Sequence, residues 1–461
     1  MRPDELAHFI DRLKSRVSGA VHQGQSIREI HGRDESACKP ALPDAVFLPE
    51  SAEDAARAIS LCAELGVPVV PFGTGSGQEG GVLAVQGGLS IDTSALNRIL
   101  EINAEDMDCL VEAGVTRLQL DRELRATGLF FPVDPGADAS IGGMVATGAS
   151  GTTTPLYGSM SDNVMGLEVV LADGSIIQTG GRAPKSSSGY DLTHLFVASE
   201  GTLGLVTKIR LKLRPQPETR IALKAHFDRL PDAVEVVTNL RSYGMPVARA
   251  ELMNATLMRG VALLQHEAPP DRHLLCLEFH GEDASANSLV SIATQVMQDF
   301  NGHDIEAVTR PEDLSKIWRI RHAASEAEKA LRPGAEVIVT DICVPVSRLA
   351  RIIDMAEGEL AKANLLAPLS GHLGDGNFHY ALLVDPTDPK ESARARAFKD
   401  WLAKAALDMG GTISGEHGIG LGKRHLMAAA HGPALSAMRA IKHALDPGNI
   451  FNPGKVFPSH D

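Results

Sequence analysis

The sequence has little of what marks secreted, membrane-spanning or disulfide-stabilised proteins. It holds only 5 cysteines in 461 residues and no CxxC pair, which favours reduced thiols over a disulfide framework or a zinc–thiolate site. No apolar run reaches the roughly 18 residues that a membrane-spanning helix needs. The first residues carry acids and lack an apolar stretch, so we expect no signal peptide. We therefore expect a cytoplasmic protein without a transmembrane segment; peripheral contact with a membrane stays open.

Basic patches are also missing. The formal net charge is -14 and no long run of Lys or Arg offsets it, so we expect no binding of nucleic acid through phosphate neutralisation. The acidity is explained more simply as a contribution to solubility. Hydrophobic residues make up 44% and charged residues 22%, which is the balance of an ordinary globular protein, and the length predicts two or three domains.

Mixed helical and strand patterns predict an α+β fold. Ser51 is typical of a helix start, and Gly66 ends that helix before a strand at 67–72. Asp173-Gly174 predicts a hairpin. Further strands are expected at 221–226, 273–280, 336–344 and 378–384, and helices at 285–300, 347–364 and 434–445. The expected divisions are a partly helical lead-in (1–40), a glycine-rich domain (41–216), an α+β substrate domain (217–412) and a C-terminal segment (413–461).

A glycine-rich loop (73–81) follows the strand at 67–72. Gly75, Gly77 and Gly80 spell GxGxxG, but a Rossmann fingerprint needs a helix to begin at the loop, and residues 81–92 have a strand pattern instead. The loop lacks GK[ST], which excludes a P-loop. Backbone N–H groups of consecutive glycines can still bind a pyrophosphate without a helix. With two more glycine-rich stretches, at 142–151 and 200–204, the loop indicates a long ligand such as FAD.

Four stretches carry a specific resemblance: PFGTGSGQEGG, PVDPGADASIGGMVATGASGT, YGSMSDNV and SEGTLGLVT. They resemble the D-lactate dehydrogenase (cytochrome) and glycolate oxidase D-subunit family, whose FAD-binding domain is of the vanillyl-alcohol-oxidase (PCMH) type. The likeness covers nearly the whole chain. It implies that the loop 72–78 holds the pyrophosphate, and that FAD is bound non-covalently because this loop has no histidine. The implied FAD contacts are Pro71, Phe72, Gly73, Thr74, Gly75, Ser76, Gly77, Pro135, Gly136, Ser140, Gly143, Thr147, Gly148, Gly151, Tyr157, Asp162, Val164, Glu200, Gly204, Val206 and Asn452.

Two histidine-containing motifs lie in the second half of the chain, GHLGDGNFHY (371–380) and ISGEHGIGLGKR (413–424). Two imidazoles and a carboxylate suit Zn or Mn with open positions for a substrate. His372 and His379 would face opposite sides of a straight strand, but the intervening Gly374-Asp375-Gly376 turn could bring both onto one face. From spacing alone, ordinary polar residues beside a turn are the simpler interpretation.

The resemblance decides between these interpretations, because family members share both motifs. It implies that His372, His379 and Glu416 are the metal ligands and that His417 is the general base. The substrate carboxylate needs a fixed cation, for which Arg319 and Arg321 are the candidates and the family pattern points to Arg321. Asn377 is a further substrate-binding candidate. The implied reaction passes a hydride from a small D-2-hydroxy acid to FAD and the electrons to cytochrome c or a quinone.

Two positions bear on the substrate. One position lies two residues before Asp341. The D-2-hydroxyglutarate branch of the family has a lysine there, whereas this chain has Val339. Ala381, two residues after the second histidine, is not polar either. Both favour a small or apolar substrate tail, so D-lactate leads, with glycolate and D-2-hydroxyglutarate as alternatives. A non-catalytic, FAD-binding electron-transfer subunit is the alternative of another class. The oligomeric state is open, a homodimer included.

Overall fold

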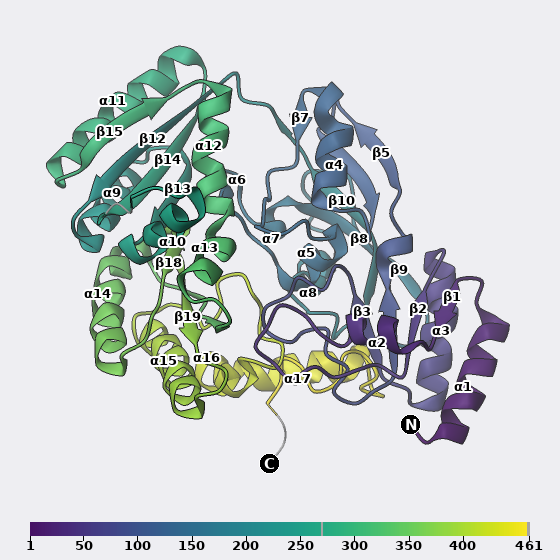
Figure 1. Ribbon diagram of the computed structural model, residues 1–461. Helices are drawn as coiled ribbons and strands as arrows, with labels where there is room; N and C mark the ends of the chain where they lie inside the picture. The colour runs from purple at the N-terminus through teal and green to yellow at the C-terminus, as the bar shows by residue number, and fades with distance from the viewer. Residues whose placement is uncertain (269–270, 459–461) are drawn as a thin grey trace. The chain divides into compact units, whose positions relative to one another are not determined.

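The chain forms two compact units in a computed structural model that describes residues 1–268 and 271–458 (Figure 1). The first unit comprises Met1–Ser150, Ser159–Gln216 and the chain from Glu416 onward. The second comprises Gly151–Gly158 and Pro217–Gly415. Across the described ranges, no helix combines the length and apolarity needed to cross a bilayer.

The first unit holds two main sheets. A four-stranded sheet has the order β1-β2-β4-β3 and a five-stranded antiparallel sheet has the order β5-β6-β10-β8-β9. The strands of this unit are β1 (Ala20–His22), β2 (Ala45–Leu48), β3 (Val69–Phe72), β4 (Leu89–Asp92), β5 (Ile99–Asn103), β6 (Asp108–Glu112), β7 (Leu129–Phe130), β8 (Val164–Val170), β9 (Ile176–Gly180), β10 (Leu205–Lys212) and β11 (Arg214–Pro215).

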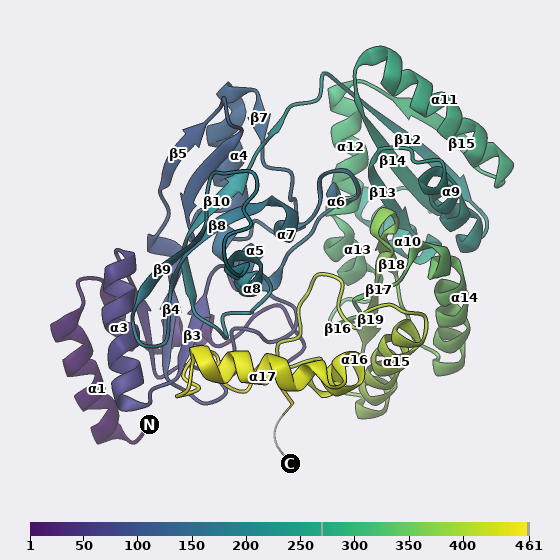
Figure 2. The same cartoon turned by 180° about the vertical axis from the view of Figure 1, so that it is seen from behind.

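The helices of the first unit cover these sheets; Figure 2 shows α1 and α3 side by side at its edge. Its α-helices are α1 (Pro3–Arg16), α2 (Gln25–His31), α3 (Ala52–Leu65), α4 (Arg117–Leu124), α5 (Ile141–Thr147), α7 (Met160–Asn163), α8 (Leu192–Phe196), α16 (Met427–His431) and α17 (Ala434–Leu445). Short 3-10 turns are η1 (Thr93–Ala95), η2 (Arg125–Thr127) and η4 (Arg424–Leu426).

The local predictions for this unit are largely confirmed. Ser51 caps α3 by accepting a hydrogen bond from the amide of Asp54, and Gly66 ends the helix at a φ of 64°. The predicted hairpin is formed by β8 and β9. Residues 73–88, all of them described, contain no helix, as expected for a loop that is not a Rossmann fingerprint. The strand expected over 81–92 was too long: it is confined to β4, because Gly87 and Gly88 both have positive φ.

The second unit is built on an eight-stranded antiparallel sheet. Its order is β15-β12-β14-β13-β18-β19-β16, with β17 also paired to β19. The strands are β12 (Thr219–Phe227), β13 (Val247–Met253), β14 (His273–Gly281), β15 (His303–Val308), β16 (Glu336–Val339), β17 (Ile342–Cys343), β18 (Leu369–His372) and β19 (Asn377–Val384). The strand predicted at 336–344 is interrupted between β16 and β17, where Thr340 and Asp341 turn their polar groups toward other segments.

Helices cover both faces of this sheet. On one face, α10, α12 and α13 pack around a core that includes Trp318 and Cys276. On the other face, Tyr380 donates a hydrogen bond to Glu357 of α14, α9 packs beside α14, and α11 packs beside α9. The α-helices are α6 (Thr154–Tyr157), α9 (Leu230–Ser242), α10 (Ala255–Gln265), α11 (Asp283–Asp299), α12 (Pro311–His322), α13 (Ala324–Leu331), α14 (Val346–Ala363) and α15 (Pro389–Asp408), and η3 spans Leu373–Asp375.

The pairing of the strands places several polar residues opposite one another on the sheet face that α12 covers. Glu278 pairs with Arg249, Glu251 pairs with His372, and His372 pairs with Asn377. Because paired residues on neighbouring strands point to the same side of a sheet, these side chains form one continuous polar row in the second unit.

Candidate active site

The two histidines of the first motif are brought onto one sheet face by a tight hairpin. Gly376 closes the turn at a φ of 80°, and a Cβ there would lie 2.0 Å from the carbonyl oxygen of Val344, so only glycine fits. Across the hairpin Ser370 pairs with His379. The ligand atoms of His372 and His379 lie within 4.8 Å of one another. The turn that the sequence suggested is therefore present.

His372 is oriented by a buried carboxylate. Its Nδ1 lies 2.7 Å from Oε1 of Glu251, which is 0% exposed. Burial would raise the pKa of Glu251, but the charges of His372 and Arg321 and their hydrogen bonds hold that pKa below its usual value. The carboxylate is thus an acceptor for Nδ1–H, which leaves Nε2 of His372 as the ligand nitrogen.

His379 is oriented in the same way by a backbone carbonyl. Its Nδ1 lies 3.1 Å from the carbonyl oxygen of Thr340 and donates to it, so Nε2 is again the ligand nitrogen. A histidine whose second ring nitrogen donates to a carboxylate or carbonyl is the usual arrangement of a metal ligand. The donor set of the pair therefore fits a divalent metal.

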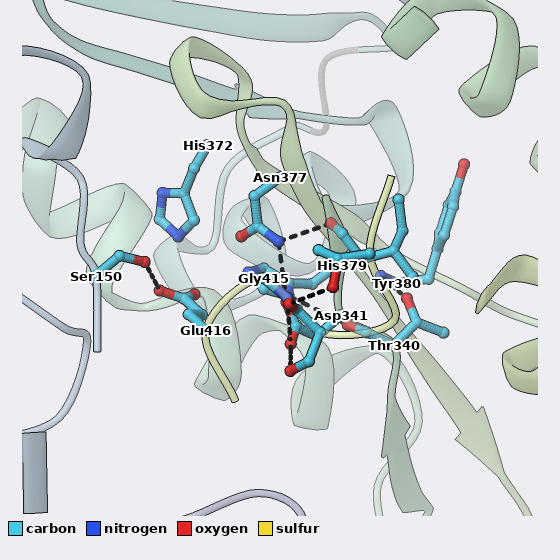
Figure 3. Close-up of polar contacts among 12 residues, drawn as sticks. Ser150, Thr340, Asp341, His372, Asn377, His379, Tyr380, Gly415 and Glu416 are labelled. Carbon is cyan, nitrogen blue, oxygen red and sulfur yellow. Dashed lines mark hydrogen bonds and ion pairs between the residues drawn. The ribbon is translucent and has the colours of Figure 1, made fainter. Parts of the chain in front are cut away.

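Asp341 ties the hairpin to the second motif (Figure 3). Its buried carboxylate accepts from Nδ2 of Asn377 at 2.9 Å, from Oγ of Ser414 at 2.7 Å and from the amide of Gly415 at 3.0 Å. Among the described residues, Oδ1 of Asn377 is a buried atom without a hydrogen-bond partner, so it is available to a ligand. Asp341 thereby fixes the chain at the residue directly before Glu416.

The two arginine candidates differ in position. Arg321, on α12, places Nε 2.6 Å from Oε2 of Glu251 and Nη2 3.3 Å from Nε2 of His372. Arg319 is exposed. The structure brings Arg321 to the histidines, which is the placement that the family pattern implies.

Glu416 and His417 belong to the first unit and directly follow Gly415 in the chain. The carboxylate of Glu416 accepts a hydrogen bond from Oγ of Ser150 at 2.7 Å (Figure 3). Both side chains are half-buried in an irregular segment. Their roles as ligand and base stay predictions.

The three glycine-rich stretches of the first unit pack against one another. A Cβ on Gly73 would lie 2.4 Å from Oγ of Ser140, which caps α5, and a Cβ on Gly201 would lie 2.8 Å from Cγ of Pro71. The amide of Glu200 donates to the carbonyl of Ala146. Close backbone approach at these glycines brings the three stretches together, which fits a single long ligand.

Other residues expected to contact FAD also support the loops. The Glu200 carboxylate accepts from the amides of Ile419 and Gly420, while burial raises its pKa despite these bonds. Asn452 donates to the carbonyls of Gly81 and Glu200. Asp162 is exposed and caps α7. Direct contacts of these residues with FAD stay predictions.

Sequence reasoning missed Glu251 and, in its positioning role, Asp341. Glu251 lies in the otherwise apolar stretch around AELM, and a buried strand carries a carboxylate only if the charge is paired. A carboxylate in an apolar strand therefore indicated a buried ion pair, although the sequence did not identify its partners.

Two family models match most of the chain. Residues 43–180 match the family model described as FAD binding domain, and residues 216–456 match FAD linked oxidases, C-terminal domain. The chain is 44% identical to "Probable D-lactate dehydrogenase, mitochondrial" of Danio rerio, covering 95% of this chain and 88% of that protein. It is 38% identical to "D-lactate dehydrogenase (cytochrome), mitochondrial" of Arabidopsis thaliana, covering 99% and 81%. It is 33% identical to "Glycolate oxidase subunit GlcD" of Bacillus subtilis, covering 93% and 92%.

Solved structures share the fold. p-Cresol methylhydroxylase with substrate bound aligns with a TM-score of 0.78 at 21% identity, covering 99% of this chain and 97% of that chain. 4-Ethylphenol oxidase from Gulosibacter chungangensis aligns with a TM-score of 0.78 at 19% identity, covering 100% and 98%. Together with the two matched domains, they confirm the expected α+β fold with a PCMH-type FAD-binding domain.

Proposed function

Since this chain belongs to the family of FAD-linked oxidases that includes the D-lactate dehydrogenases, we propose that it oxidises D-lactate, or a similarly small D-2-hydroxy acid, to the 2-oxo acid. The observation that carries the proposal is the pair His372 and His379, each with Nδ1 held by an acceptor so that Nε2 is the nitrogen that can bind a metal, beside the guanidinium of Arg321. Such a site suits a substrate that combines a carboxylate with an adjacent hydroxyl.

We propose that His372, His379 and Glu416 hold a divalent metal, Zn or Mn. Consecutive Cα atoms are about 3.8 Å apart, so the hydrogen bond from the Gly415 amide to Asp341 keeps Glu416 close to that anchored residue. Two imidazoles and a carboxylate leave coordination positions open. When bound, the metal would lower the pKa of the substrate hydroxyl.

The remaining residues divide the chemistry. Nη2 of Arg321, which donates to Nε2 of His372 in this structure, would turn to the substrate carboxylate when that nitrogen binds a metal. We assign the removal of the hydroxyl proton to His417, because it is the imidazole next to Glu416 in the second motif. When bound, FAD would supply the acceptor for the hydride that leaves C2 of the substrate.

Flavin bleaching under anaerobic conditions tests the function. D-Lactate is expected to bleach the flavin absorbance of the holoenzyme within the dead time or seconds of mixing, whereas L-lactate leaves it unchanged, because one enantiomer alone places its C2 hydrogen toward the flavin. A panel containing glycolate and D-2-hydroxyglutarate separates the alternatives within the fold. If no 2-hydroxy acid of the panel bleaches the flavin, the protein is the non-catalytic electron-transfer subunit instead.

The substrate size is set by two residues that pair across the sheet. Val339 of β16 lies opposite Ala381 of β19. Ala381 is two residues from His379 on the same strand and therefore shares its face. The surface beside the metal-binding histidines is thus small and apolar, which supports D-lactate over a dicarboxylate.

Val339→Lys is expected to move specificity toward D-2-hydroxyglutarate. A lysine at this position can meet a second carboxylate, and a hydrogen bond between charged groups is worth at least about 1.5 kcal/mol, or roughly tenfold in the ratio of kcat/KM for D-2-hydroxyglutarate over D-lactate. Val337→Lys is the matched control, because Val337 lies on the same face of β16 but opposite Leu383, two pairs farther from His379. An equal shift in both variants would contradict a specific role of Val339.

The electron acceptor and the location are also proposals. The Arabidopsis relative carries "cytochrome" in its name, which supports cytochrome c as the acceptor, with a quinone as the alternative. The cytoplasmic location expected from the sequence stays a prediction, since the names of the Danio rerio and Arabidopsis thaliana relatives place those proteins in mitochondria. A homodimer likewise stays a prediction.

A further inference from the structure

The six residues that follow His417 are held in place by two glutamates of the first unit. These six residues, 418–423, are called the clamped segment below. Glu79 lies in the first glycine-rich loop, and Glu200 begins the third glycine-rich stretch. Both glutamates belong to the same compact unit as the chain from Glu416 onward. The proposed metal site and the proposed substrate contacts give neither glutamate a part in the chemistry.

Glu200 holds the first half of the clamped segment. Its Oε1 accepts a hydrogen bond from the amide of Ile419 at 2.7 Å, and its Oε2 accepts one from the amide of Gly420 at 2.8 Å. Gly418 lies against the same carboxylate at a φ of 80°, since a Cβ there would lie 3.0 Å from Cδ of Glu200. Because both carboxylate oxygens are engaged, Glu200 fixes the position and the direction of the chain directly after His417.

Glu79 holds the second half. Its backbone carbonyl accepts hydrogen bonds from the amides of Leu421 at 2.7 Å and Gly422 at 3.1 Å. Its Oε1 lies 3.3 Å from Nζ of Lys423, and the two residues are 3% and 2% exposed. Removing one charge of a buried ion pair leaves the other without its partner, which is strongly destabilising. The ion pair therefore holds the end of the clamped segment at Glu79.

The backbone of the clamped segment has its hydrogen bonds almost entirely with these two glutamates. Of the amides at 419–423, two donate to the Glu200 carboxylate, two donate to the Glu79 carbonyl, and the last donates to the carbonyl of Ile419. An irregular segment whose amides are all engaged in this way resists local opening. Because consecutive Cα atoms are about 3.8 Å apart, the fixed first residue of the segment restricts where His417 can lie.

We propose that Glu200 and Glu79 are positioning residues for His417, which keep its imidazole within reach of the substrate hydroxyl. The proposal rests on the proposed function, which makes His417 the base. Proton transfer needs a hydrogen-bonding distance, and a displacement of about 1 Å can cost about 100-fold in rate. The two glycine-rich stretches would then have a second task besides their expected contacts with FAD. Glutamates that only stabilised the fold would not affect the step that depends on His417.

A double-mutant cycle with His417 tests the proposal. Glu200→Gln replaces one of the two acceptor oxygens with an NH2 group, so one of the two amide hydrogen bonds is lost. The variant is expected to lower kcat for D-lactate about tenfold, with KM and FAD content nearly unchanged. The solvent deuterium isotope effect on kcat is expected to rise, because removal of the hydroxyl proton becomes the slower step. In a His417→Ala background the same substitution is expected to have almost no further effect, since no base is left to misplace.

Hydrogen exchange gives a readout that needs no turnover. In the holoenzyme without substrate, the amides of the clamped segment are expected to exchange about tenfold faster in Glu200→Gln than in the wild type. Gly420→Ala is a second variant that alters no carboxylate. Its Cβ would lie 2.1 Å from the carbonyl oxygen of Glu79, so the segment must shift, and a similar loss of kcat is expected. If Glu200→Gln does not fold, Gly420→Ala decides.

Asp54→Asn is the matched control. The carboxylate of Asp54, in the same unit, likewise accepts from two consecutive amides, those of Ser18 and Gly19, both at 2.8 Å. The control is expected to keep the wild-type kcat and the wild-type exchange of the clamped segment.

Three results would overturn the proposal. They are wild-type kcat or wild-type exchange in both Glu200→Gln and Gly420→Ala, an equal fold-loss with and without His417, and an equal loss of kcat in Asp54→Asn. A wild-type flavin that D-lactate does not reduce would instead count against the proposed function, and the exchange measurement separates that result from a failure of the two glutamates to hold the segment.

Discussion

Replacing His417 with alanine is expected to lower kcat for D-lactate by at least about 100-fold, the usual worth of general-base catalysis. The substrate hydroxyl must lose its proton as the C2 hydride leaves, and in the variant only water remains to take that proton. KM is expected to change little, because the carboxylate contact of Arg321 is untouched. Steady-state reduction of an artificial dye measures both constants.

The pH profile of the His417→Ala variant gives an independent check. The acidic limb of the wild-type kcat profile, which reports protonation of the base, is expected to disappear in the variant. His443→Ala serves as the control, because His443 is an exposed histidine on α17. A His417→Ala enzyme with near-normal kcat would assign the proton transfer to another group.

Removing the metal is expected to abolish activity while the yellow flavin stays bound. The proposed ligands of the metal lie in the two histidine-containing motifs, whereas the predicted contacts of FAD lie mainly in the glycine-rich stretches, so a chelator should separate the two cofactors. Dialysis against a strong chelator, followed by elemental analysis and an absorption spectrum, tests this expectation. Adding Zn or Mn back to the dialysed protein then identifies which ion restores turnover.

Single substitutions complement the chelator. His379→Ala is expected to lose both bound metal and activity with FAD retained, since a site with one imidazole and one carboxylate binds divalent ions weakly. Ser370→Ala, at the position paired with His379 across the hairpin, is the control and is expected to keep its metal. Full activity after verified metal removal would mean that the histidines act on the substrate directly.

Local signals predicted much of the fold. The cap at Ser51, the stop at Gly66 and the turn at Gly376 act within a few residues, and each has the expected conformation. The interruption at Thr340 and Asp341 could not be foreseen, because the reason for it is distant: these residues bind His379, Asn377 and Gly415. Hydrogen bonds between remote segments leave no periodic trace in the sequence.

In the candidate site, too, local features could be predicted and contacts between distant segments could not. The motifs around His372 and His379 were identifiable from the sequence, and the hairpin that joins them follows from a single glycine. The carboxylate that orients His372 could not be identified, because Glu251 precedes it by 121 residues and meets it only through the register of β13 and β18. The sequence thus pointed to the two histidines of the candidate site, but not to the groups that orient them.

Successive residues of β19 alternate strictly between the two faces of the sheet. This alternation separates the residues that determine substrate range from those that stabilise the fold. Asn377, His379 and Ala381 face the site, whereas Phe378 and Tyr380 alternate with them and pack into the opposite layer. A library of variants at Ala381 and its partner Val339 can therefore explore new substrates without touching the aromatic residues that stabilise the layer beneath. In such a scaffold, changes of substrate range can accumulate at little expense in folding stability, which makes this strand the natural starting point for directed evolution.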